Sequence, residues 1–246
     1  MLLCWALYLH IMFLFLPLIG ALDVQKTNVI FIMYDDLRTE LGAYGRKHMI
    51  TPNFDRLAAK SVVFDKAYCQ VAVCNPSRDS MLTGLRPDTV GTYAFQSSFR
   101  PHMSLNSHMA QAGYNTAGYG KISHWEWNDK KEWSFEQWDN EWYKYQQTEL
   151  TFMNASTMPD KTRPEHSFRD WQFATKAISG LRRMATDASG KYFMLAVGFK
   201  LPHLAVHLPY KYFEMYVFCS TDLLPPFLVC DVCLSLIHLL LSACIL

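Results

Sequence analysis

Two continuous apolar runs, at residues 28–34 and 192–199, constrain the fold of this chain most strongly. Both runs are rich in β-branched and aromatic side chains, and neither alternates with polar residues. Strands that are buried on both faces have this pattern, and they occur in parallel sheets that helices cover on both sides. The chain is therefore predicted to contain a parallel sheet to which both runs contribute.

Helix and strand signals alternate between these two runs. Thr51-Pro52 supplies an N-cap and a first-turn proline, and Gly84 and Gly113 each follow a helical segment as C-terminal stops. Helices are expected over residues 52–60, 77–83, 102–112 and 165–184, and further strands over residues 61–64 and 115–119. This alternation predicts an α/β fold with a largely parallel sheet.

The two ends of the chain differ from its middle. Residues 1–22 contain an apolar run followed by Gly20-Ala21, which is typical of a secretory signal peptide; an uncleaved signal anchor is the alternative. Residues 217–246 are interpreted either as a membrane anchor or as a divergent tail from an intron or alternative exon. Secretion would make Asn154, in Asn154-Ala155-Ser156, an acceptor for N-glycosylation.

Composition excludes several classes of partner and framework. The formal net charge is +1, from 23 basic and 22 acidic residues, so the balance does not predict nucleic-acid binding. Seven cysteines do not form a recognisable disulfide framework, and Cys230 and Cys233 lack a second pair of zinc ligands. The tryptophan-rich residues 124–145 either line a sugar site or cover the edge of the sheet.

The strongest chemical signal is Cys74-Asn75-Pro76-Ser77-Arg78, which Leu82-Thr83-Gly84 follows. A cysteine at the start of a helix lies beside unpaired backbone N–H groups and the positive end of the helix dipole, an environment that favours anions. Arg78 is one turn further along. The alternative is a buried structural cysteine before a proline-serine helix start.

Polar residues that follow the strands complete the set of candidates. Asp35 and Asp36 come directly after the first apolar run, where carboxylates suit a hard cation such as calcium; the alternative is a solvated turn. Lys121 and His124 follow the strand expected at 115–119, and His203 follows the second apolar run. A lysine pairs with anionic oxygens and a histidine acts as general acid or base, although a lone histidine is usually structural.

Taken together, these residues resemble the sulfatases of the alkaline-phosphatase-like superfamily. The resemblance implies a three-layer α/β/α sandwich with a mostly parallel central sheet, truncated at its C-terminal end. It also implies hydrolysis of sulfate esters on glycosaminoglycan sugars, in the lysosome or outside the cell. A formylglycine-generating enzyme would oxidise Cys74 to Cα-formylglycine, whose hydrate carries two hydroxyls on one carbon.

The resemblance also assigns roles to the individual residues. Cys74 would be the nucleophile and a metal ligand, Asp35 and Asp36 would be ligands of one calcium ion, and Arg78, Lys121, His124 and His203 would contact the diol and the sulfate. The family's later Asp-His metal pair and sulfate-binding lysine have no counterpart after Tyr216. Residues 23–216 are therefore expected to be an incomplete catalytic region, inactive or nearly so alone.

Two other functions remain open at this point. The first is hydrolysis of phosphonate or phosphate monoesters by an enzyme of the same superfamily. The second is a non-catalytic protein that retains a groove for sulfated sugars, either secreted or held at the membrane by its hydrophobic tail.

Overall fold

The computed structural model describes residues 26–95, 102–124, 133–134, 136–138, 157–203 and 206–217. The predicted signal peptide, the sequon at Asn154, the hydrophobic tail beyond residue 217 and most of the tryptophan-rich segment lie outside the described residues. None of the helices in the described ranges has the length and apolar character that a bilayer crossing requires.

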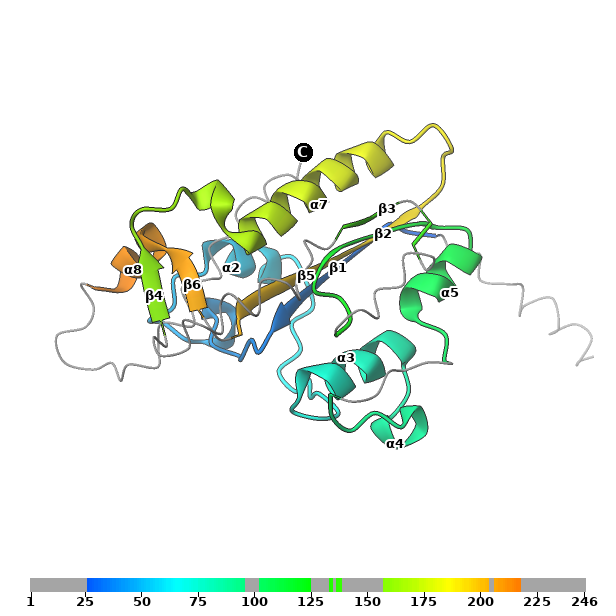
Figure 1. The fold of residues 1–246 in the computed structure, drawn as a ribbon, viewed down its shortest axis with the longest axis horizontal. Helices are drawn as coiled ribbons and strands as arrows, with labels where there is room; N and C mark the ends of the chain where they lie inside the picture. Colours follow the sequence, from blue (N-terminus) through cyan, green and yellow to red (C-terminus); the bar gives the residue numbers. More distant parts are fainter. Residues whose placement is uncertain are drawn as a thin grey trace, which may run out of the picture.

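A parallel sheet of four strands forms the centre of the molecule (Figure 1). In spatial order, its strands are β1 (Val29–Asp35), β5 (Phe193–Pro202), β2 (Asn115–Gly120) and β3 (Glu136–Trp138). Every residue of β5 is buried, because two strands flank it and helices cover both of its faces. Both apolar runs are therefore confirmed as strands, and they pair directly with each other.

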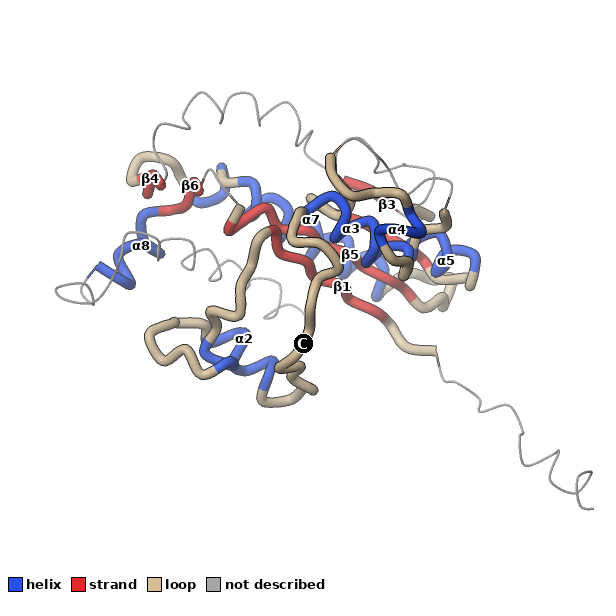
Figure 2. Tube along the Cα trace, turned by 90° about the horizontal axis from the view of Figure 1, so that it is seen from below, coloured by secondary structure: helices blue, strands red, loops and turns tan. Residues whose placement is uncertain are grey.

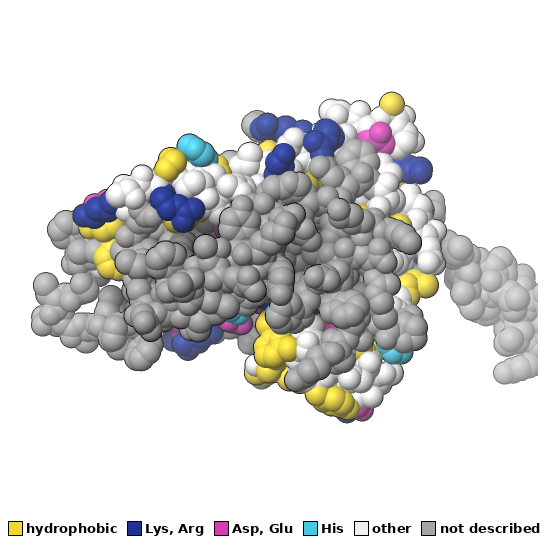
Figure 3. All heavy atoms as spheres, viewed as in Figure 1, with side chains coloured by type: hydrophobic (Ala, Val, Ile, Leu, Met, Phe, Trp, Pro, Cys, Tyr) yellow, Lys and Arg dark blue, Asp and Glu magenta, His cyan; other side chains and the backbone are white. Residues whose placement is uncertain are grey.

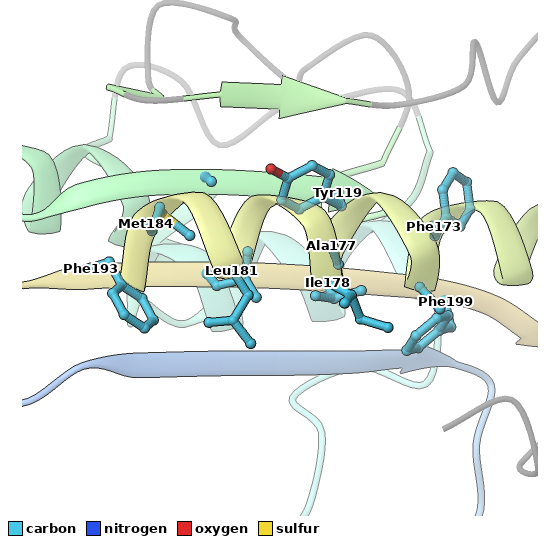
Figure 4. Packing of buried hydrophobic residues seen from close by; sticks show 12 residues of the cluster. Tyr119, Phe173, Ala177, Ile178, Leu181, Met184, Phe193 and Phe199 are labelled. Carbon is cyan, nitrogen blue, oxygen red and sulfur yellow. The ribbon is translucent and has the colours of Figure 1, made fainter. Parts of the chain in front are cut away.

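One face of the sheet is covered by the long helix α7 (Arg169–Ala185). Its apolar side presents Phe173, Ala177 and Leu181 to Tyr119 of β2 and Phe199 of β5 (Figure 4). Burial of each large side chain here stabilises the fold by roughly 1.5–3 kcal/mol.

The opposite face is covered by three short helices. They are α3 (Cys74–Thr83), α4 (Pro87–Val90) and α5 (Leu105–Gln111). Leu82, Val90 and Met109 pack on Met33 and Met194 from the sheet. Helices on both faces, visible in Figure 1, confirm the predicted three-layer α/β/α architecture.

A smaller group of elements lies beyond one end of the sheet (Figures 1 and 2). The parallel pair β4 (Thr157–Asp160) and β6 (Val206–Pro209) is followed by α8 (Tyr210–Val217), and Leu208 and Tyr212 share a small core there. The remaining described elements are the short turns η2 (Gly42–Tyr44) and η5 (Glu165–Ser167) and the helix α2 (Pro52–Ala58).

Four expected elements differ from the structure: the strand at residues 61–64 is absent, and the helices expected at 77–83, 102–112 and 165–184 begin at residues 74, 105 and 169. Residues 61–64 do not form a strand; Val62 is 80% exposed and Phe64 is 69% exposed. A β-branched sequence needs a neighbouring strand to satisfy its backbone, and none of the described strands pairs with this segment. Helix α3 begins at Cys74, three residues earlier than expected, because Pro76 in the first turn lacks only an N–H that the helix does not use.

Candidate active site

The carboxyl ends of three parallel strands bring the predicted residues to one edge of the sheet. β1 ends at Asp35, which is paired in register with Pro202 of β5. Lys121 follows β2 directly, and its backbone N–H donates to the carbonyl of Gly198 on β5 at 2.8 Å. His203 follows β5. The predicted meeting of Asp35, Lys121 and His203 at one edge is a consequence of this parallel register.

Helix α3 contributes Cys74 from the other layer. Cys74 is the first residue of the helix, after the extended residue Val73, and is half-buried. Its Sγ atom lies 3.4 Å from Nδ1 of His124, which follows β2 and is buried. The nucleophile candidate and its predicted histidine partner are therefore in contact, although 50 residues separate them in the chain.

Arg78 joins the helix to two of the strand ends. One guanidinium nitrogen, Nη1, donates to the carbonyls of Lys121 at 2.6 Å and Ile122 at 3.0 Å. The other, Nη2, donates to Oδ1 of Asp35 at 3.0 Å. Its side chain is 5% exposed, and these three bonds hold α3, β1 and the residues after β2 in one arrangement.

Asp35 carries the negative charge at the centre of this cluster. Oδ1 pairs with Arg78, and Oδ2 accepts a hydrogen bond from the ammonium group of Lys121. Burial opposes ionisation of Asp35, but the two cations outweigh it and lower the pKa of this carboxyl. Burial lowers the pKa of Lys121, and its attraction to Asp35 counteracts part of that effect. The buried charges of Asp35, Arg78 and Lys121 sum to +1, which suits a bound anion.

Cys74 and His124 are both held in their neutral forms. Burial raises the pKa of the Cys74 thiol, although the nearby Lys121 opposes this. Burial and the charge of Lys121 lower the pKa of His124 to about 3. An unmodified thiol in this position is therefore a poor nucleophile, because a thiolate–imidazolium pair requires shifts in the opposite directions.

The three predicted metal ligands, Asp35, Asp36 and Cys74, do not form a metal site on their own. Asp36 is exposed, with a left-handed φ of 63°, whereas both oxygens of the buried Asp35 already bind cations. Within the described residues, no group of three or more His, Cys, Asp or Glu side chains converges as a metal site would require. A calcium ion takes six to eight oxygens, so these residues fit at most part of its shell.

Sequence reasoning missed one residue that supports the site. Asp170, in the first turn of α7, is buried, and its two carboxylate oxygens accept the backbone N–H groups of Lys200 and Leu201, each at 2.9 Å. These bonds fix the end of β5 immediately before His203. A carboxylate on the otherwise apolar side of the helix is the sequence signal that identifies it.

Comparison with known proteins assigns the family. The sulfatase family profile matches residues 27–223. The chain belongs to the sulfatase family. The chain is 34% identical to mouse iduronate 2-sulfatase over 229 residues and 35% identical to the human enzyme over 216 residues. These alignments cover 84% and 80% of this chain but only 40% and 39% of the relatives, so this sulfatase spans less than half of their length.

Solved structures confirm the fold of this sulfatase. The phosphonate monoester hydrolase of Agrobacterium radiobacter matches with a TM-score of 0.57 at 19% identity, over 77% of this chain and 44% of that enzyme. A structure solved with its substrate D-glucosamine-2-N,6-O-disulfate matches with a TM-score of 0.59 at 23% identity, over 82% of this chain and 40% of the other. The stretches at residues 35–38, 41–45 and 86–89 predict a resemblance to iduronate 2-sulfatase within the family, and the two mammalian relatives confirm that resemblance over most of the chain.

Proposed function

We propose that this chain carries the nucleophile and sulfate-binding part of an active site that hydrolyses sulfate esters on glycosaminoglycan sugars. The observation that carries the proposal is the contact of Cys74 Sγ with His124 Nδ1 at 3.4 Å, next to the buried Arg78–Asp35–Lys121 cluster. The substrate class follows from similarity to iduronate 2-sulfatases, and the setting is the secretory pathway, with a lysosomal or extracellular destination.

The positive cluster and the start of α3 would bind the sulfate group. Lys121 and Arg78 give the buried cluster its excess positive charge, and the first turn of α3 adds backbone N–H groups and the positive end of its dipole. Both features lie beside Cys74. A sulfate held there would place its sulfur atom near the Cβ substituent of residue 74, as an attack on sulfur requires.

The raised pKa of the Cys74 thiol and the neutral His124 beside it suit a formylglycine better than a thiolate. When Cys74 has been oxidised by a formylglycine-generating enzyme, the hydrated aldehyde supplies one hydroxyl to attack sulfur and a second to expel the sulfate. His124, which is neutral, would accept the proton of the attacking hydroxyl as the bond to sulfur forms, because only then is that hydroxyl acidic enough to protonate a histidine whose pKa is lowered. His203 would donate a proton to the leaving alcohol. Arg78 and Lys121 would balance the charge that develops on the sulfate oxygens.

Calcium would take part in the proposed reaction only when its full set of oxygen ligands is present. Asp35 and Asp36 are hard oxygen ligands at the correct strand end, and they would contribute to one ion once other carboxylates are present. Because the described residues provide only part of that shell, no step above depends on the ion. We expect the 246-residue chain by itself to be inactive or nearly so.

Tandem mass spectrometry of the peptide that contains Cys74 tests the proposal directly. The chain would be produced in a secretory host that contains a formylglycine-generating enzyme. We expect an aldehyde at residue 74 and an intact thiol at the exposed Cys69, which serves as an internal control in the same chain. An unmodified thiol at both positions would remove the basis of the proposed chemistry.

A second candidate is hydrolysis of phosphonate or phosphate monoesters, which the shared fold of the phosphonate monoester hydrolase favours. Both reactions would use the same positive cluster. A longer form of this protein, containing the remaining ligands, would be assayed on an aryl sulfate and on the matched aryl phosphonate. A preference for the sulfate supports the first proposal, and a preference for the phosphonate supports the second.

A further inference from the structure

The exposed side of helix α7 concentrates positive charge that the proposed reaction does not use. Around the helix axis, one continuous arc contains only polar residues: Arg169, Gln172, Thr175, Lys176, Ser179, Arg182, Arg183 and Thr186. Lys176, Arg182 and Arg183 are exposed, and Arg169 is half-buried. The arc contains no acidic side chain. Figure 3 shows Lys and Arg side chains gathered along the edge of the molecule where α7 lies in Figure 1.

Helix stability accounts for only part of this charge. Arg182 and Arg183 lie in the last turn, where cations interact favourably with the helix dipole. Lys176 lies in the middle of the helix, where the dipole has little effect, and Arg169 lies in the first turn, where a cation is unfavourable. A requirement for helix stability alone therefore does not select this arrangement.

We propose that this arc, called the α7 basic face, binds a segment of a sulfated glycosaminoglycan chain outside the active site. Arginine forks bind sulfate oxygens in pairs, and the hydroxyl of Ser179, which accepts a hydrogen bond from Arg183, adds one donor between the cations. The helix of 17 residues is about 25 Å long, enough to contact several sugars of an extended polymer. This inference rests on the proposed function for the choice of polymer.

The position of the face relative to the site supports this partner. The first turn of α7 lies at the edge of the sheet that carries the site, since Asp170 binds the backbone of Lys200 and Leu201. A polymer that follows the α7 basic face would reach this edge of the sheet at the first turn of the helix, whereas α3, which carries Cys74, covers the opposite face. An anionic membrane fits less well, because the exposed arc has no aromatic or aliphatic side chain that would enter a lipid interface.

The test compares two double variants with the same change in charge. Lys176→Gln with Arg182→Gln removes two cations of the α7 basic face, and Arg56→Gln with Lys60→Gln removes two exposed cations near α2. Binding of a heparin-derived octasaccharide is measured by fluorescence anisotropy over a range of salt concentrations. We expect the first variant to lose about tenfold in affinity and about one to two units of the log–log salt slope, and the control to change less than about twofold.

Three further measurements distinguish a sulfated sugar chain from other anionic partners and separate its binding from the proposed chemistry. Non-sulfated hyaluronan of matched length should bind at least about tenfold more weakly than the octasaccharide, and phosphatidylserine vesicles should not compete with it. The α7 basic face does not need the aldehyde at residue 74, so wild-type protein with an unmodified thiol should bind the octasaccharide with the same affinity, and failure of the proposed chemistry would leave this result unchanged. Equal losses in the two double variants, equal binding of hyaluronan, or competition by the vesicles would overturn the inference.

Discussion

Arg78 is the residue on which the geometry of the site depends most. It donates from two nitrogens to three acceptors, namely the carboxylate of Asp35 and the carbonyls of Lys121 and Ile122. A planar guanidinium reaches all three at once, whereas an ammonium group on a flexible stem cannot. The planar shape of the side chain at position 78 is therefore more important than its charge.

Arg78→Lys is expected to destabilise the fold although it preserves the charge. The variant leaves buried carbonyls without donors, and the free energy of unfolding should fall by about 2–4 kcal/mol in urea denaturation. Arg86→Lys is the matched control, because Arg86 pairs with Asp88 at the surface and its side chain is 78% exposed. It should change the free energy of unfolding by less than about 0.5 kcal/mol. Equal losses in the two variants would contradict this account of Arg78.

The residues at this edge of the sheet also show how much of the candidate site the sequence alone could predict. The motif around Cys74 and the polar residues after the strands predicted the members of the site, and the structure brings Cys74, His124, Lys121 and Asp35 together. The sequence could not predict that both carboxylate oxygens of Asp35 pair with cations, one with Arg78 and the other with Lys121. That pairing depends on side chains 43 and 86 residues away, whose distance only the packed layers fix.

At the scale of elements, α7 and β5 are coupled through Asp170. Burial raises the pKa of Asp170 to about 6, although the N–H groups of Lys200 and Leu201 lower it. An acid whose pKa is raised in the folded state contributes stability that is fully present below its unfolded pKa. That contribution is lost as the pH rises through about 6.

Asp170→Asn should therefore change both the stability and its pH dependence. The amide turns one acceptor into a donor opposite a backbone N–H, which costs about 1–3 kcal/mol. Relative to the variant, the melting temperature of the wild type should fall by about 5–10 °C between pH 4 and pH 7.5. Circular dichroism melts check this, with the exposed Asp88→Asn as control. A constant difference between wild type and Asp170→Asn across this range would be incompatible with a titrating Asp170.

The close contact between β5 and the residues after β2 depends on the absence of a side chain at Gly198. A Cβ atom at Gly198 would lie 1.6 Å from the carbonyl oxygen of Lys121, which is backbone and cannot move aside without displacing the site. Gly198→Ala should therefore destabilise the fold by about 3 kcal/mol or more and weaken the binding of sulfate.

Gly190→Asn is the control for this variant. Gly190 adopts a left-handed φ of 64° and has no atoms within 4 Å of its hypothetical Cβ, and asparagine tolerates this conformation better than other side chains. Its effect on thermal stability should be under about 1 kcal/mol. A Gly198→Ala chain as stable as wild type would mean that β2 and β5 do not approach this closely.

For the whole molecule, the net charge of the buried cluster predicts which ions stabilise the chain. Inorganic sulfate at about 10 mM should raise the melting temperature, because binding to the native state alone stabilises it, and Lys121→Gln should abolish the rise. Calcium at the same concentration should raise it by less than about 1 °C, because Asp35 is already neutralised. Differential scanning fluorimetry measures both ions, and a larger effect of calcium would show that the carboxylates do bind the metal.

The sequence by itself determined the class of the fold and predicted which candidate residues the structure brings together at one edge of the sheet. Continuous apolar runs require burial on both faces, and residues at the ends of parallel strands must meet at one edge. The failed strand at residues 61–64, the charge balance around Asp35 and the role of Asp170 were decided only by the tertiary structure. The physical reason is that strand pairing, ion pairing and burial are properties of neighbours in space, which local propensity does not contain.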